Sequence, residues 1–162
     1  MALMDAKEYD PRPAQRRNRI IATAVVVVIA VAVWLYLTRY NAEKRVINKF
    51  FQAIEQKDFD TAYGIYQGDP EWKQHPQKFA NYTVNQFKLD WGPSSEYGPI
   101  TSHNVDCALA PPKKDFVSPG GVVVVVTINN RAEPRNMWVD KKTQSISDTP
   151  PIMGTVLCHG QQ

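Results

Sequence analysis

Apolar and polar positions divide this chain into a long uncharged run, a stretch of helical periodicity and a stretch of strand-like segments. The uncharged run is Ile20 to Leu37, which reads IIATAVVVVIAVAVWLYL. As a helix it would reach about 27 Å at roughly 1.5 Å per residue, close to the hydrocarbon thickness of a bilayer. A buried strand does not fit, because strands rarely exceed about ten residues. Residues 20–37 are therefore predicted to be a transmembrane helix whose partner is the lipid bilayer.

The flanks of this run fit a membrane anchor. Trp34, Tyr36 and Tyr40 stand at its far end, where amphipathic rings prefer the headgroup layer. Residues 1–19 are polar and are predicted to be a disordered cytoplasmic tail. Residues 38–41 are predicted to be a juxtamembrane linker.

Orientation rests on the basic residues beside the run. Arg16, Arg17 and Arg19 directly precede it, whereas only Arg39 lies close on the other side. Basic residues near a span favour the cytoplasmic side. The run is longer than the apolar part of a signal peptide, and no small-residue cleavage site follows it. We expect an uncleaved single-pass signal-anchor, with the N-terminus in the cytoplasm and the C-terminal domain outside it.

Helical periodicity continues in Ala42 to Lys57, where one apolar stripe recurs at helical spacing: Val46, Ile47, Phe50, Phe51 and Ile54. Asn41 could cap this helix. Because no strong helix breaker precedes Asn41, the helix could instead be continuous with the membrane span. Asp58 is predicted to cap a second helix that ends at Gly68-Asp69-Pro70.

A third helix is predicted to start at Pro76 and stop at Trp91-Gly92-Pro93. Its apolar face would carry Phe79, Tyr82, Thr83 and Phe87.

Strand-like segments follow Pro93. Thr101 to Leu109 alternates, so His103, Val105, Cys107 and Leu109 would share one face. Val122 to Ile128 is a continuous β-branched run, typical of a central strand covered on both faces. Asn136 to Asp140 would return as a hairpin, with short strands around Ser145 to Ser147 and Thr155 to Cys158.

Helices followed by strands predict an α+β domain over residues 42–148, with the helices packed on an antiparallel sheet and a C-terminal tail over 149–162. The segment Phe50-Phe51-Gln52-Ala53-Ile54 through Asp58-Phe59-Asp60-Thr61-Ala62-Tyr63 and Tyr66 resembles the opening of NTF2-like (cystatin-like α+β) domains. This resemblance implies a curved sheet that often encloses a pocket, and bacterial examples hang from a single N-terminal span. A shared fold would not by itself mean that this chain catalyses the reaction of any NTF2-like protein.

The charge distribution and the absence of several known sequence motifs argue against nucleic-acid binding and against several classes of enzyme. The formal charge is +3, but residues from Ala42 onward carry 13 basic and 13 acidic side chains, so no nucleic-acid partner is expected. The sequence contains no Gly-rich phosphate loop, GxSxG or HExxH motif, and we expect no catalytic residues, cofactor or metal site. Cys107 and Cys158 could form one disulfide or remain two buried thiols. His103 and Trp91 could border a pocket.

Two functions remain open from the sequence. The first is a non-catalytic domain held at the membrane surface, which binds an envelope or membrane protein or assists assembly. The second is a pocket in the cone of an NTF2-like fold that binds or isomerises a small apolar molecule. A buried carboxylate with a shifted pKa inside such a pocket would favour the second.

Overall fold

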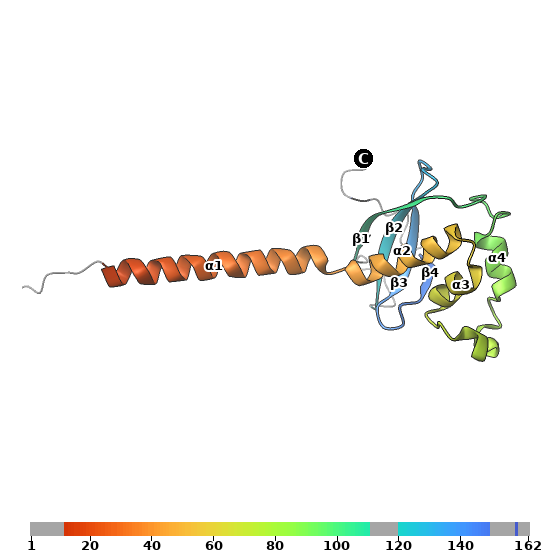
Figure 1. Cartoon of the computed structure of the whole chain (residues 1–162), viewed down its shortest axis with the longest axis horizontal. Coiled ribbons are helices and arrows are strands. Elements are labelled where there is room, and N and C mark those ends of the chain that lie inside the picture. Colours follow the sequence, from red (N-terminus) through yellow and green to blue (C-terminus); the bar gives the residue numbers. More distant parts are fainter. Residues whose placement is uncertain (1–11, 111–119, 150–157, 159–162) are drawn as a thin grey trace, which may run out of the picture. The chain divides into compact units, whose positions relative to one another are not determined.

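The computed structural model describes residues 12–110, 120–149 and 158 (Figure 1). It divides the chain into two units, residues 1–39 and residues 40–162. The first unit holds one long helix, and the second is an α+β domain with a four-stranded antiparallel sheet. The strand expected around Thr155 to Cys158, and most of the expected tail over 149–162, lie outside the described residues.

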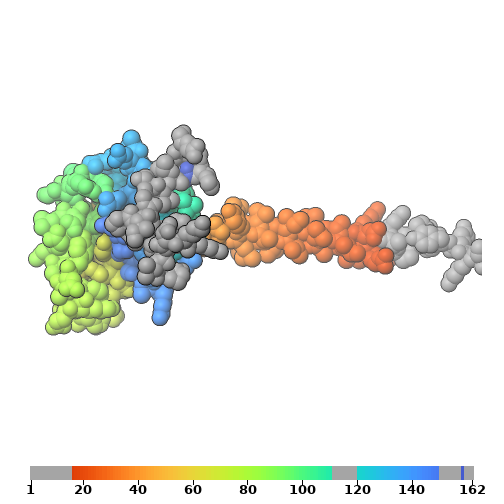
Figure 2. Space-filling model, turned by 180° about the vertical axis from the view of Figure 1, so that it is seen from behind, coloured from red at the N-terminus to blue at the C-terminus, as the bar shows by residue number. Residues whose placement is uncertain are grey.

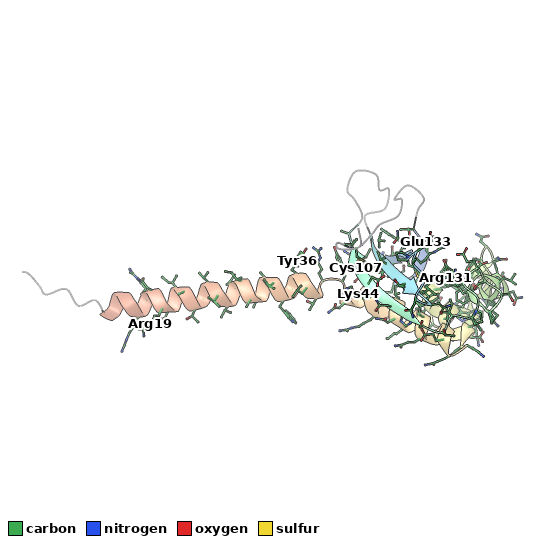
Figure 3. All side chains as sticks on the ribbon, turned by 90° about the horizontal axis from the view of Figure 1, so that it is seen from above. Arg19, Tyr36, Lys44, Cys107, Arg131 and Glu133 are labelled. Carbon is green, nitrogen blue, oxygen red and sulfur yellow. A yellow bond between two sulfur atoms is a disulfide. The ribbon has the colours of Figure 1, made fainter. Side chains whose placement is uncertain are left out.

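Helix α1 (Arg12–Thr38) is long and apolar enough to cross a membrane. Its described side chains from Arg16 to Tyr36 are exposed, and Figure 3 shows Arg19 and Tyr36 near opposite ends of the helix. The expectation that residues 1–19 are disordered is wrong from Arg12 onward. Pro13 suits a first helical turn, and the Ala, Gln and Arg residues after it are good helix formers, so the helix extends beyond the apolar run.

Helix α2 (Asn41–Glu55) is separated from α1 by Arg39 and Tyr40 alone, so the non-helical junction is two residues long where the sequence suggested a linker over 38–41. Asn41 lies within the helix rather than capping it, and the capping residue Tyr40 makes no side-chain cap hydrogen bond. Tyr40 instead packs against the domain core, with the Lys141 ammonium 5.6 Å from its ring centroid. The boundary between α1 and α2 therefore falls beside a residue that packs against the core, and no helix-breaking residue stands there.

Helix α3 (Phe59–Gln67) begins and ends where the sequence predicted. The Asp58 carboxylate accepts a hydrogen bond from the Thr61 backbone N–H at 3.1 Å. This bond satisfies a free N–H of the first turn. Hydrogen bonding by the Thr61 side chain, and next by this backbone N–H, lowers the Asp58 pKa. Gly68 closes the helix with φ 65°, a left-handed conformation that glycine adopts at no steric cost.

The single third helix expected from Pro76 is wrong. The structure has two short 3₁₀ helices, η1 (Trp72–Gln74) and η2 (Pro76–Phe79), and a separate helix α4 (Val84–Trp91). Thr83 caps α4 by accepting from the Gln86 N–H at 3.3 Å. The carbonyl of Tyr82 accepts from the hydroxyl of Tyr63, a bond between distant residues that no local pattern reveals.

The sheet is an antiparallel meander in the order β1-β2-β3-β4: β1 (His103–Leu109), β2 (Gly121–Ile128), β3 (Arg135–Asp140) and β4 (Ile146–Asp148). Helices α2, α3 and α4 and one face of this sheet enclose the described core. Val122, Val124 and Val126 supply the centre of that face, and Phe50, Phe51 and Tyr63 meet it from the helices. Fully burying one such side chain contributes about 1.5–3 kcal/mol to stability.

A β-bulge in β1 overturns the expectation that His103 and Cys107 share a face. Val105 pairs with Val126, but Cys107 pairs with Val125, so Asp106 is the extra residue. Because side chains alternate along a strand, one extra residue moves every later side chain to the other face. His103 therefore lies on the helix-covered face, and Cys107 lies on the opposite one.

The opposite face of the sheet is buried as well. Val123 and Val125 are almost completely buried there, as a central strand covered on both faces requires. Trp138 pairs with Val123, and its ring occupies the space where a side chain at Gly121 would stand. Cys107 forms a disulfide with Cys158 on this face, with the two Cα atoms 5.9 Å apart.

Candidate functional site

His103, at the start of β1, joins the sheet to α2 through hydrogen bonds. Its Nδ1 lies 2.7 Å from Glu55 Oε1 and its Nε2 lies 3.0 Å from Asn48 Oδ1, so both ring nitrogens have partners on α2. Its ring stacks on Phe51 with the centroids 5.2 Å apart. His103 does not line any of the three surface cavities formed by residues within 60–74, 66–148 and 96–135 of the described chain. These contacts make His103 a packed structural residue.

Trp91, the other residue expected at a pocket, ends α4 and packs on the same Phe51. The ring centroids of Trp91 and Phe51 are 5.9 Å apart, so Phe51 stands against both Trp91 and His103. The fully buried Phe51 thus fills the space where the two rings could have bordered one pocket. Trp91 does reach a surface cavity, where its ring stacks on Tyr97 at 5.9 Å.

Two adjoining surface cavities, of about 360 and 520 Å³, form what we call the tyrosine groove. They share Glu96, Tyr97 and Arg135. The surfaces of residues 82–97 and 131–135 meet at one end of the domain in Figure 2. The aromatic and charged residues that line the groove are Tyr66, Tyr82, Asp90, Trp91, Glu96, Tyr97, Arg131, Glu133, Arg135 and Asp148.

Helices α3 and α4 supply the first wall of the groove. Tyr66 comes from the last turn of α3, and its ring lies 5.4 Å from that of Tyr82. The Tyr82 hydroxyl donates to Asp90 Oδ2 at 2.8 Å, and Gln86 donates to the other oxygen of Asp90 at 3.1 Å. Asp90 is thereby fixed beside the two tyrosine rings.

The second wall is the loop that carries Tyr97, and Asn129 holds it. The Asn129 side chain donates to the carbonyls of Tyr97 and Pro99 at 3.3 and 3.0 Å. Its Oδ1 accepts from the backbone N–H groups of Thr101 and Ser102 at 2.9 and 3.3 Å. One side chain in the β2–β3 turn thus fixes the whole approach to β1.

Two arginines of the chain already lie in the groove. Arg135 bonds Asp148 Oδ1 at 2.7 Å and lies 3.6 Å from Glu96 Oε1. Arg131 stands with its guanidinium carbon 5.2 Å from the Tyr97 ring centroid and donates to the Glu96 carbonyl at 2.8 Å. Figure 3 shows Arg131 and Glu133 close to each other on the domain.

Burial and nearby carboxylates keep the tyrosines of the groove protonated. Burial, followed by the charges of Asp148 and Asp90, raises the pKa of Tyr66 to about 12. Burial, followed by the hydrogen bond with Glu96, raises the pKa of Tyr97 to about 12. The pKa of Tyr82 is raised in the same way, by burial and by its bond to Asp90. All three hydroxyls are therefore neutral near pH 7.

Leu89 adds an apolar contact at the rim. It is 61% exposed, and it is the one exposed large apolar side chain that the structure describes after Thr38. A single exposed leucine is ordinary, but this one lies beside a concave, aromatic-lined surface. Binding surfaces combine such aromatic and apolar contacts with a polar surround.

Within the described ranges, no group of three His, Cys, Asp or Glu side chains is placed to hold a metal ion. The chemistry that the groove offers is hydrogen bonding, aromatic contact and charge. Comparisons of this chain with protein-family models, with curated proteins and with solved structures found no match.

Of the residues that line the groove, the sequence reasoning singled out Trp91, as a possible neighbour of a pocket with His103, and it did not predict the groove. Tyr97 stands in an irregular Ser-Ser-Glu-Tyr-Gly-Pro stretch, and Arg135 lies at the start of a strand. The available signal was local: a tyrosine among turn residues lies in a surface loop, where binding residues are common. In the structure Tyr97 also packs partly against the core. Nothing local indicated that α3, α4 and the β2–β3 turn would meet there.

Proposed function

We propose that this chain is a single-pass membrane protein whose α+β domain binds another protein through the tyrosine groove. The observation that carries the proposal is the groove itself, a concave surface with four aromatic rings and the exposed Leu89 at its rim. Aromatic residues are enriched at the buried centres of protein interfaces. Helix α1 would hold the domain at the bilayer and raise its local concentration there.

The orientation we propose places the N-terminus in the cytoplasm and the domain outside it. Arg16, Arg17 and Arg19 support this orientation, because basic residues beside a span favour the cytoplasmic side. The disulfide between Cys107 and Cys158 supports it independently, since disulfides persist outside the reducing cytoplasm. A reporter fused after Gln162 that works only in the cytoplasm should be inactive, and its activity would reverse the orientation.

Photo-crosslinking tests the partner-binding function. A photoreactive amino acid in place of Leu89, in the full chain in its own membranes, should yield one defined adduct identified by mass spectrometry. The same amino acid at Lys49, an exposed position on α2, is the control and should not yield that adduct. Tyr97→Ala should reduce the adduct from position 89. Equal adducts from both positions, or none from position 89, would refute the groove as the binding surface.

An internal pocket for a small apolar molecule has less support. Phe50 and Phe51 are fully buried between α2 and the sheet and fill the volume that such a pocket would need. The two cavities of the tyrosine groove are lined mainly by polar surface, and they are open to solvent.

The NTF2-like fold is also a proposal. Its support is the helix-then-strand order, together with the burial of Ala62 and Tyr63 from the Asp58-Phe59-Asp60-Thr61-Ala62-Tyr63 segment. An experimental structure superimposed on NTF2-like domains tests it. Strand connections that differ from theirs would exclude the family.

A further inference from the structure

We propose that the part of the tyrosine groove beside Asp90 takes the cationic end of a lysine or arginine side chain from a partner protein. This inference rests on the proposed function and names the chemistry of the partner at that same site.

Charge is the first argument. Among the described residues, the groove is lined by four carboxylates, Asp90, Glu96, Glu133 and Asp148, and by two cations. Both cations, Arg131 and Arg135, are already engaged within the groove. A groove with an excess of negative charge attracts a cationic partner.

The groove's own arginines show how a cation sits in it. The guanidinium of Arg135 pairs with Asp148, and that of Arg131 stands over the Tyr97 ring. Both arrangements, a carboxylate pair and a cation–π contact, are those by which a groove recognises an ammonium or guanidinium group.

Asp90, like Asp148, is a carboxylate beside aromatic rings of the groove, but no arginine or lysine described in the structure pairs with it. Among the described residues, no Lys, Arg or His nitrogen lies within 4.0 Å of its carboxylate. Tyr82 and Gln86 hold the carboxylate in place, and the Tyr66 and Trp91 rings line the same cavity. The position is built and charged, and no side chain described in this chain neutralises it.

The shape of the groove favours a side chain on a polypeptide over a free amine. The two cavities continue into one another through Glu96, Tyr97 and Arg135, so the opening is longer than a small amine needs. Leu89 stands at the rim, where the aliphatic stem of a lysine or arginine, or an adjacent apolar residue, could pack.

The test uses the full chain in nanodiscs of zwitterionic phosphatidylcholine and three fluorescent peptides of sequence Gly-Ser-Leu-Xaa-Ser-Gly. Xaa is arginine, lysine or citrulline, the last being a neutral isostere of arginine. Fluorescence anisotropy measures the dissociation constants. The arginine and lysine peptides should bind at least tenfold more tightly than the citrulline peptide, and binding should weaken as salt rises. Equal binding of the citrulline peptide would overturn the inference.

Two matched variants locate the site. Asp90→Asn keeps an oxygen that accepts the Tyr82 hydrogen bond but removes the charge, and it should weaken the arginine peptide at least fivefold. Glu71→Gln makes the same charge change at an exposed residue outside the groove and should leave binding unaltered. Equal effects of the two variants would place the cation elsewhere and contradict the inference.

A crosslinking experiment on the wild-type protein gives a second test, which does not require any variant to fold. The arginine peptide with a benzophenone next to its arginine should crosslink within residues 82–97. Crosslinks elsewhere would overturn the inference. Agmatine, a free amine with a guanidinium group, is the remaining arm, and binding as tight as that of the peptide would assign the site to small amines.

The crosslinking experiment from position 89 separates this inference from the proposed function. A partner adduct that persists in Asp90→Asn, together with no preference for cationic peptides, would leave the partner-binding function standing and remove the cation site. If the wild-type protein gives neither the adduct from position 89 nor binding of the cationic peptides, both the partner-binding function and the cation site are refuted.

Discussion

At the scale of single residues, Asn129 does more than occupy a turn. It adopts a left-handed backbone with φ 50°, and its side chain makes the hydrogen bonds that hold the loop from Tyr97 to Ser102. Asn130 next to it has φ 54° and is exposed. The two residues share a backbone conformation but not a role, which makes them a matched pair.

We predict that Asn129→Gly destabilises the domain by about 1–3 kcal/mol, because the loop loses its side-chain bonds and leaves polar groups unpaired. Glycine tolerates positive φ, so the variant isolates the hydrogen bonds from backbone strain. Asn130→Gly should change the free energy of unfolding by less than about 0.5 kcal/mol. Urea unfolding of both variants checks this, and equal values would show that Asn129 matters only for its backbone.

The tyrosines of the groove predict an alkaline transition. Burial raises the pKa of Tyr66 and of Tyr97 to about 12 in the folded domain, from the ordinary tyrosine value of 10.0. Between these values the unfolded chain has lost protons that the folded domain keeps, so the stability is complete below about pH 10 and falls as pH rises toward 12.

Tyr66→Phe should therefore flatten the decline of unfolding free energy between about pH 10 and pH 12. Absorbance at 295 nm should show one fewer late-titrating phenol in this variant. Tyr36→Phe, which alters an exposed ring on α1, is the control and should leave the slope unchanged. An identical slope in all three proteins would mean that Tyr66 ionises as freely as an exposed tyrosine.

At the scale of elements, the face of the sheet away from the helices depends on close contact between β2 and β3. A Cβ added to Gly121 would overlap the Trp138 ring, far inside van der Waals contact. Gly120 is its neighbour, but a Cβ there would meet Asp140 at an ordinary 3.6 Å. Trp138 can lie across this position only because β2 begins with a glycine.

We predict that Gly121→Ala displaces Trp138 and costs about 1–3 kcal/mol, the usual range for overpacking a filled site. Gly120→Ala should be close to neutral. Near-UV circular dichroism reports the tryptophan, and thermal unfolding reports the stability. A Gly121→Ala protein with an unaltered tryptophan signal and unaltered stability would contradict this contact.

At the scale of the whole molecule, the described part of the α+β domain has a hydrophobic core of its own. The buried residues of that core begin at Ile47, and Tyr40 is the first residue that packs against it. Helix α1 instead exposes its described apolar side chains, which suits lipid and not a protein interior.

A chain that begins at Tyr40 should therefore be soluble, monomeric and cooperatively folded. Its buried aromatic and β-branched residues pair helices with sheet without lipid. Differential scanning calorimetry should show a single transition, and gel filtration should give the mass of one chain. Aggregation, or a monomer without a cooperative transition, would mean that α1 is part of the fold.

The sequence by itself determined what depends on local periodicity and on end signals. The uncharged run gave the long apolar helix, and Asp58 with Gly68 marked both ends of α3. The β-branched run gave the central strand β2. These features follow from side-chain spacing and from capping bonds between residues a few positions apart, so they can be read along the chain.

Only the tertiary structure decided what depends on contacts between distant residues. The bulge at Asp106 reversed the faces of β1 beyond it, and Phe51 filled the space between His103 and Trp91. The tyrosine groove exists because α3, α4 and the β2–β3 turn meet at one end of the domain. Periodicity assigns a residue to a face, but it does not say which other element covers that face, and that choice created the groove.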